Sequence, residues 1–114
     1  GMQRLYTHEL ELTKKLWSAL AEMPCVRLYT PKPYAGGYLP VLSFNVTGKT
    51  SAETAEILNK SGIAVRAGLH CAPTAHRQIG TIDTGTVRVS PAAFNTSYDI
   101  AAAASVIKNV NFFK

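Results

Sequence analysis

The spacing of apolar residues predicts three helices along the chain. From residue 5 to residue 22, leucines and a tryptophan recur at the spacing of one helix face, and a proline ends the pattern. A second helix is predicted to begin at Thr50 or Ser51 and to end at residues 61–62, a Ser–Gly pair. A third is predicted over residues 98–110, whose alanine run favours a closely packed helix.

Four short strands are predicted between these helices. Residues 26–29 and 39–46 lie between the first two helices, and residues 63–66 and 86–90 lie between the second and the third. The segments 39–46 and 86–90 alternate apolar and polar residues, as half-buried strands do. The sequence therefore predicts an α+β fold with the order α-β-β-α-β-β-α, in which helices pack on one face of a four-stranded, mostly antiparallel sheet.

The length and composition fit one domain of a soluble protein. The chain has 114 residues, near the commonest domain size, and 46% of them are hydrophobic. No apolar stretch is long enough to cross a membrane, and no leader pattern opens the sequence. Gly1 before Met2 resembles a tag remnant, so the domain is taken as residues 2–114. Charged residues make up only 17%, which is typical of a surface partly covered by something outside the chain.

Net charge and cysteine content limit which binding partners and which cellular compartment are expected. The net charge is +5, but the 12 basic residues are scattered and form no stripe of the kind that binds nucleic acid. DNA and RNA are therefore not expected as partners. The two cysteines are Cys25 and Cys71, and without a secretion signal both are expected to be reduced thiols in a cytoplasmic protein.

The longest connection, residues 69–85, holds most of the reactive side chains. Cys71 follows a glycine-bearing turn, His70 precedes it directly, and His76 lies further along the same segment. The histidines and the neighbouring arginines make this segment cationic. Nearby cations lower the pKa of a thiol and increase its thiolate fraction. The pattern therefore makes Cys71 a candidate nucleophile.

Three other interpretations of Cys71 stay open. A free cysteine is often an inert, buried thiol. His70, Cys71 and His76 offer three zinc ligands, but adjacent ligands seldom point at one metal and no C-x-x-C pair accompanies them. A Cys–His hydrolase or acyl transferase is a further alternative, for which orienting and oxyanion elements are missing. The residues alone support the nucleophile and the inert thiol about equally, they favour both over a zinc site, and no metal ligands are assigned.

Two arginines on predicted strands are candidates for binding an anionic group. Arg66 ends one strand, and Arg88 lies in the alternating strand 86–90 on the face opposite Val87 and Val89. A lone arginine on an open sheet face is usually solvated, whereas a functional guanidinium forks onto a carboxylate or phosphate. Two arginines on neighbouring strands beside a Cys/His segment suit a small anionic substrate.

A resemblance to a known enzyme family covers most of the chain. It rests on the segments G-I-A-V-R-A-G-L-H-C-A-P and G-T-V-R-V-S-P-A-A-F-N-T, within residues 62–96. These segments resemble the C-terminal domain of class V aminotransferase-fold enzymes, in particular the cysteine desulfurase and selenocysteine lyase branch with an R-x-G-x-H-C-A motif. The resemblance implies the small domain of a pyridoxal-phosphate (PLP) enzyme that removes sulfur from L-cysteine, or selenium from selenocysteine, to leave alanine.

The resemblance also implies roles for four residues. Cys71 matches the nucleophile that carries the sulfur as a persulfide, and His70 matches the histidine before it. Arg88 matches the arginine that binds the substrate carboxylate, and Arg66 matches a second arginine near that site. A homodimer and a sulfur-acceptor protein are further implied for the full-length enzyme. Leu69 stands where the commonest motif has another histidine, so the choice of amino-acid substrate stays open.

The PLP-binding elements of that family are not found in this sequence. Its lysines lie on predicted helices, in turns or at the terminus, and none has the surroundings of a Schiff-base lysine. The chain is therefore interpreted as a C-terminal domain without the large PLP-binding domain, and we expect it alone to bind no PLP and to be inactive. Two alternatives stay open. One is another reaction of the same fold, transamination or epimerisation, with Cys71 incidental; the other is a stand-alone thiol interaction module.

Overall fold

The computed structural model describes residues 2–36, 41–68, 85–90 and 93–112, and every structural statement concerns these residues. The described helices and strands follow the predicted order, with two strands between successive helices. The elements are α1 (Met2–Ala21), β1 (Val26–Leu28), β2 (Leu42–Val46), α2 (Ser51–Lys60), β3 (Val65–Gly68), β4 (Thr86–Val89), α4 (Ser97–Lys108) and the 3-10 turn η2 (Val110–Phe112).

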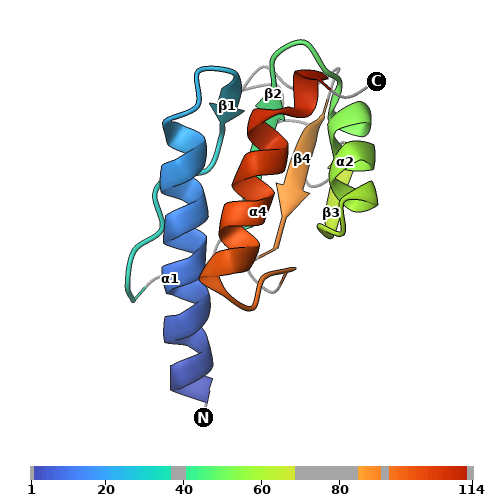
Figure 1. Ribbon diagram of the computed structural model, residues 1–114. Coiled ribbons are helices and arrows are strands. Elements are labelled where there is room, and N and C mark those ends of the chain that lie inside the picture. The colour runs from blue at the N-terminus through green and yellow to red at the C-terminus, as the bar shows by residue number, and fades with distance from the viewer. Residues whose placement is uncertain (1, 37–40, 69–84, 91–92, 113–114) are drawn as a thin grey trace.

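The four strands form one antiparallel sheet, and the helices cover one of its faces (Figure 1). The order across the sheet is β1-β2-β4-β3, with every neighbouring pair antiparallel. β4 therefore lies between β2 and β3 and joins the two halves of the chain. The predicted α+β fold, with helices on one face of a four-stranded sheet, is confirmed.

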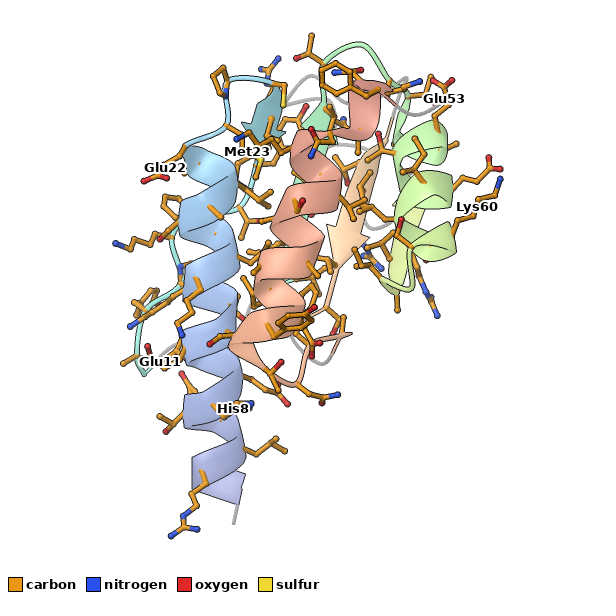
Figure 2. All side chains as sticks on the ribbon, viewed as in Figure 1. His8, Glu11, Glu22, Met23, Glu53 and Lys60 are labelled. Carbon is orange, nitrogen blue, oxygen red and sulfur yellow. The ribbon has the colours of Figure 1, made fainter. Side chains whose placement is uncertain are left out.

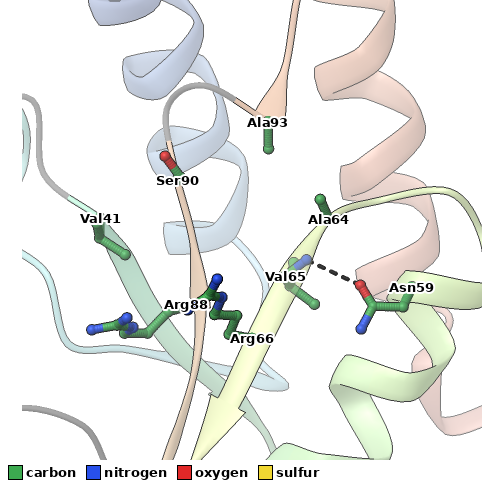
Figure 3. A pocket seen from close by; sticks show the side chains of 8 residues that line it. All are labelled: Val41, Asn59, Ala64, Val65, Arg66, Arg88, Ser90 and Ala93. Carbon is green, nitrogen blue, oxygen red and sulfur yellow. Dashed lines mark hydrogen bonds between the residues drawn. The ribbon is translucent and has the colours of Figure 1, made fainter.

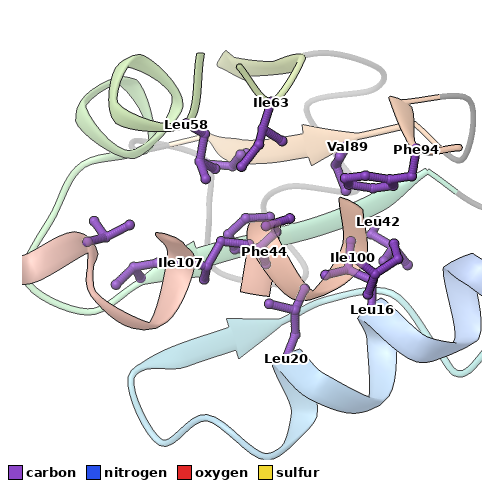
Figure 4. Close-up of a cluster of buried hydrophobic side chains, with 14 of the residues drawn as sticks. Leu16, Leu20, Leu42, Phe44, Leu58, Ile63, Val89, Phe94, Ile100 and Ile107 are labelled. Atoms are coloured by element: carbon purple, nitrogen blue, oxygen red, sulfur yellow. The ribbon is translucent and has the colours of Figure 1, made fainter. Parts of the chain in front are cut away.

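The hydrophobic core lies between the sheet and the helices (Figure 4). Leu20 of α1, Phe44 of β2 and Leu58 of α2 are fully buried there. Apolar burial of this kind is the main driving force of folding. Ile100 and Ile107 bring one face of α4 into the same cluster. No helix in the described ranges is both long and apolar enough to span a bilayer.

The element bounds differ from the prediction at several helix and strand ends. β3 continues to Gly68, so Arg66 lies inside this strand and does not end it as predicted. α1 begins at Met2 rather than at residue 5. β3 begins at Val65, two residues later than predicted, because the N–H of Ile63 still donates to the carbonyl of Leu58 at 2.9 Å. Ile63 is buried, yet it belongs to the turn that ends α2. α4 ends at Lys108 rather than at residue 110, since Val110 starts the turn η2.

Two helices, α2 and α4, begin with a capping box. At α2, the N–H of Glu53 donates to Thr50 Oγ1 at 3.1 Å, and the N–H of Thr50 donates to Glu53 Oε1 at 2.9 Å. At α4, Thr96 and Asp99 form the same pair of bonds, at 3.2 and 3.1 Å. Each box satisfies two backbone donors that a helix start leaves without partners, and an N-cap is typically worth about 1 kcal/mol.

The carboxylate of Glu53 at the start of α2 (Figure 2) makes this helix sensitive to acid. Hydrogen bonds from the backbone and side chain of Thr50 hold the pKa of Glu53 below its ordinary value. A carboxyl whose pKa is lowered by folding adds stability above its unfolded pKa, and this stability is lost as the pH falls through the folded pKa. Glutamine keeps an acceptor at this position but does not titrate.

We therefore expect Glu53→Gln to flatten the acid limb of the stability profile. The loss in free energy of unfolding between neutral pH and a pH below the folded pKa is smaller in this variant than in the wild type. Urea denaturation at both pH values measures it. An equal loss in the two proteins would contradict the role of Glu53 in the acid sensitivity.

Candidate functional site

The sheet face that the helices leave open carries the two predicted arginines. Val87 and Val89 of β4 are buried in the core, so Arg88 between them lies on the opposite face. The register pairs Arg88 with Ser43 of β2 on one side and with Arg66 of β3 on the other. Arg66 and Arg88 therefore stand directly opposite each other on neighbouring strands (Figure 3).

A cavity of about 490 Å³ lies at this pair of arginines (Figure 3). Its polar lining comes from Arg66 and Arg88, from Asn59 near the end of α2, and from Ser90 directly after β4. The remaining wall is made of small apolar side chains. A concave site with a few polar groups among apolar ones is typical of small-molecule binding. The apolar residues are Val41, Ala64, Val65 and Ala93.

The charges around this cavity favour an anion. The four described strands contain three arginines, Arg27, Arg66 and Arg88, and no acidic residue. Every Asp and Glu in the described ranges lies in a helix or directly after one. Like charges placed directly opposite in a sheet are destabilising, and an anion that binds both relieves that repulsion. A guanidinium binds a carboxylate through two parallel, charge-assisted hydrogen bonds. The site therefore suits a small ligand with a carboxylate or phosphate group.

Thr30 holds the β2 side of the cavity in place. Its hydroxyl accepts a hydrogen bond from the N–H of Ser43 at 2.8 Å and donates one to the carbonyl of Val41 at 3.2 Å. The indole N–H of Trp17 in α1 donates to the carbonyl of Thr30 at 2.7 Å. Helix α1 thus holds Thr30, and Thr30 in turn holds the backbone of Val41 and Ser43 at the cavity.

Asn59 holds the backbone on the β3 side of the cavity. Its Oδ1 accepts a hydrogen bond from the N–H of Val65 at 3.1 Å, directly before Arg66 in the chain. No sequence motif marks Asn59, Val41 or Ser90 as a site residue. Asparagine side chains near helix ends commonly bond to nearby backbone groups, and this was the available signal for Asn59. Val41 and Ser90 reach the cavity only through strand register, which leaves no signal in the sequence.

His70 and Cys71, the other two predicted site residues, lie outside the described residues, as does His76. The structure does describe both ends of the segment that carries them. β3 ends at Gly68, which pairs with Thr86 at the start of β4. The backbones of Gly68 and Gly85 are in contact, since a Cβ added to Gly85 would lie 2.6 Å from the carbonyl carbon of Gly68.

The arginine cavity has no amine at hand for a covalently bound PLP among the described lysines. None of them lines the cavity at the arginines. Lys60 pairs with Glu56 at 3.0 Å on the surface of α2, and Lys15 donates to Ser97 Oγ at 2.6 Å. In the same ranges, no three His, Cys, Asp or Glu side chains gather as metal ligands. The residues of the arginine cavity therefore fit a carboxylate, whereas Lys14, Lys15 and Lys32 line a separate cavity beside α1.

Sequence comparisons match this chain to one protein family. The profile of the Aminotransferase class-V family matches residues 1–102. A probable cysteine desulfurase of Synechocystis sp. is 37% identical over 100 residues, which are 88% of this chain and 23% of that protein. Probable cysteine desulfurase 1 of Mycobacterium leprae is 38% identical over 110 residues, which are 96% of this chain and 17% of that protein. The chain thus spans less than a quarter of the length of these relatives.

Two solved structures share the fold. The cysteine desulfurase CsdA (S-sulfonic acid) from Escherichia coli matches with a TM-score of 0.76 and 27% identity, over 93% of this chain and 25% of that one. The apo cysteine desulfurase from Thermococcus onnurineus NA1 matches with a TM-score of 0.75 and 32% identity, over 94% and 26%. The match of the family profile over most of the sequence, together with this shared fold, shows that the chain belongs to the class V aminotransferase family.

Proposed function

We propose that this chain is the substrate-binding small domain of a PLP-dependent cysteine desulfurase or selenocysteine lyase. The observation that carries the proposal is the cavity lined by both Arg66 and Arg88, which pair in register on β3 and β4. An amino-acid substrate presents a carboxylate, which two neighbouring guanidinium groups complement in charge and shape. The relatives named as cysteine desulfurases are at least about four times as long as the segment that they share with this chain. In the proposal, residues 2–114 are the C-terminal domain of an enzyme of similar length.

Each predicted site residue has one task in this proposal. Arg88 binds the substrate carboxylate, and Arg66 adds a second positive charge that fixes its orientation. PLP is held by another part of the enzyme and supplies the electron sink when it is bound. The thiolate of Cys71 attacks the sulfur atom of the substrate, so that an S–S bond forms while the C–S bond of the substrate breaks. The electron pair of the C–S bond stays with the carbon fragment, which takes up a proton and becomes alanine, and Cys71 holds the sulfur as a persulfide. His70, next to it, tunes the thiol.

The proposal also includes the wider setting of the enzyme. The substrate is L-cysteine or selenocysteine, and the product is alanine. A sulfur-acceptor protein takes the sulfur from the persulfide, and the full-length enzyme is a homodimer. The similarity to relatives named cysteine desulfurases supports cysteine as the first substrate to test.

Arg88→Lys tests the carboxylate-binding role in the PLP-loaded, full-length enzyme. Lysine keeps the positive charge but loses the planar fork. We expect kcat/KM for L-cysteine to fall by about 10²-fold, which is the usual cost of removing one preorganised charge-stabilising group. Alanine formation measures it, with the separate 114-residue chain as the blank.

Arg27→Lys is the matched control. Arg27 lies on β1 with its guanidinium over the ring of Tyr29, 5.6 Å from the ring centre, and it does not line the cavity. We expect this surface change to alter kcat/KM by no more than about twofold. Equal effects of the two substitutions would contradict the assignment of the carboxylate to Arg88.

A further inference from the structure

We propose that a second cavity, beside α1, is a docking site for an acidic segment of a partner protein. The cavity has a volume of about 650 Å³ and lies between α1 and the connection that follows β1. We call it the lysine cavity, after Lys14, Lys15 and Lys32 in its walls. Among the described residues, it shares no lining residue with the arginine cavity. The inference therefore concerns a different surface and does not depend on the proposed function.

One wall of the lysine cavity is the outer face of α1. The residues that this helix contributes are three or four positions apart, so they lie together on one face. They are Glu11, Lys14, Lys15 and Ser18. The core leucines of α1, at positions 12, 16 and 20, are buried on the opposite face. The cavity is therefore built on the side of α1 that does not pack against the sheet.

The other wall is the connection after β1, which runs back along α1 (Figure 1). The start of this connection is fixed to the helix, because the indole N–H of Trp17 donates to the carbonyl of Thr30 at 2.7 Å. Further along, Pro33 is buried, whereas Lys32 and Tyr34 on either side of it are exposed. The buried proline thus holds the connection in place while its two neighbours stay accessible to a partner.

The lysine cavity carries an excess of positive charge. Three ammonium groups line it, against the single carboxylate of Glu11. Among the residues that the structure describes, Lys14 and Lys32 have no hydrogen-bond or ion-pair partner, and Lys15 donates to the neutral hydroxyl of Ser97 at 2.6 Å. Neighbouring like charges repel each other, and a ligand that brings several carboxylates relieves this repulsion. The charges therefore favour an acidic partner.

The arrangement favours a protein segment over a single small anion. A lysine ammonium is a compact charge on a flexible stem and lacks the planar fork with which an arginine holds one carboxylate or phosphate. The amines also come from two separate segments of the chain, so carboxylates spaced along a peptide reach them together. Tyr34 is 69% exposed beside them, and tyrosine is enriched at protein interfaces. An acidic segment with an apolar side chain fits both the amines and the ring.

Titration of the isotope-labelled, 114-residue chain with a synthetic peptide of alternating glutamate and leucine tests the inference. NMR follows the backbone amides of the protein, and we expect saturable shift changes concentrated at residues 11–18 and 32–35. In the double variant Lys14→Gln/Lys32→Gln, we expect the Kd of the peptide to rise by about tenfold. In Tyr34→Ala, we expect it to rise by about fivefold, because the apolar contact is lost.

The double variant Lys60→Gln/Lys108→Gln is the matched control. Lys60 ends α2 and Lys108 ends α4, both are exposed, and neither lines the lysine cavity. This variant loses the same amount of charge, so attraction by net charge alone would weaken equally in the two double variants. We expect the Kd of the control to stay within about twofold of the wild-type value. The amide spectra also show whether each variant is folded.

Each contrary result overturns the inference in a different way. Equal rises in Kd in the two double variants, or shifts spread over the lysines of the whole chain, would mean attraction by net charge alone. An unchanged Kd in Tyr34→Ala would remove the argument for a protein segment. Inorganic phosphate that shifts the same amides, and that also loses affinity in Lys14→Gln/Lys32→Gln, would assign the cavity to a small anion instead. None of these results bears on the desulfurase, which is proposed from the arginine cavity.

Discussion

Replacement of Cys71 by alanine is expected to abolish alanine formation from L-cysteine by the PLP-loaded, full-length enzyme. Under the proposed function, this thiolate is the group that accepts the sulfur atom, and no other side chain replaces it. Removing the attacking nucleophile of an enzyme lowers turnover by about 10³-fold or more. Alanine formation gives the rate, and mass spectrometry of the protein after turnover shows whether a persulfide forms at Cys71.

Cys25→Ala serves as the internal control for this experiment. Cys25 is a free, half-buried thiol directly before β1, outside the arginine cavity. We expect Cys25→Ala to retain turnover and persulfide formation. Unchanged turnover in Cys71→Ala would instead favour transamination or epimerisation by the same fold. A wild-type enzyme that forms no alanine would favour the stand-alone thiol module.

Gly85→Ala is expected to cost more than about 3 kcal/mol of folding free energy, more than an alanine at any other glycine that the structure describes. At φ +67° an alanine is strained by about 1–2 kcal/mol. The new Cβ would also lie 2.6 Å from the backbone of Gly68, a contact that no flexible side chain can relieve. Urea denaturation of the 114-residue chain measures the effect.

Gly62→Ala separates the two causes of that loss. Gly62 has a positive φ of +87°, yet nothing lies within 4 Å of a Cβ added there. This substitution is expected to cost about 1–2 kcal/mol, from backbone strain alone. Equal losses in the free energy of unfolding at the two positions would show that the contact of the new Cβ with the Gly68 backbone adds no cost.

Local sequence patterns account for most of the fold. The alternation in residues 86–90 places Arg88 opposite Val87 and Val89, as observed, because side chains on a strand alternate whatever the rest of the sheet does. The capping residues Thr50 and Thr96 likewise bond only to residues within their own first turn. The predicted start of β3 was wrong, because a buried isoleucine at position 63 fits the turn after a helix as well as it fits a strand.

The candidate site depends more on long-range pairing, which local patterns do not contain. That Arg66 and Arg88 lie on strands was predicted, but their direct opposition depends on the register of β3 with β4. Val41 reaches the same cavity only because β2 pairs with β4. The roles of Cys71 and His70 come from the family resemblance and stay predictions, since both residues lie outside the described ranges.

The central place of β4 has a consequence for how the chain acquires its fold during synthesis. β4 is the last of the described strands to leave the ribosome, yet both β2 and β3 pair with it. Before residues 86–89 emerge, β1 can pair with β2, whereas β3 has no partner among the described strands. Unpaired strand edges promote association with other chains. The nascent chain is therefore most exposed to aggregation just before β4 is made, and the sheet closes in one late step.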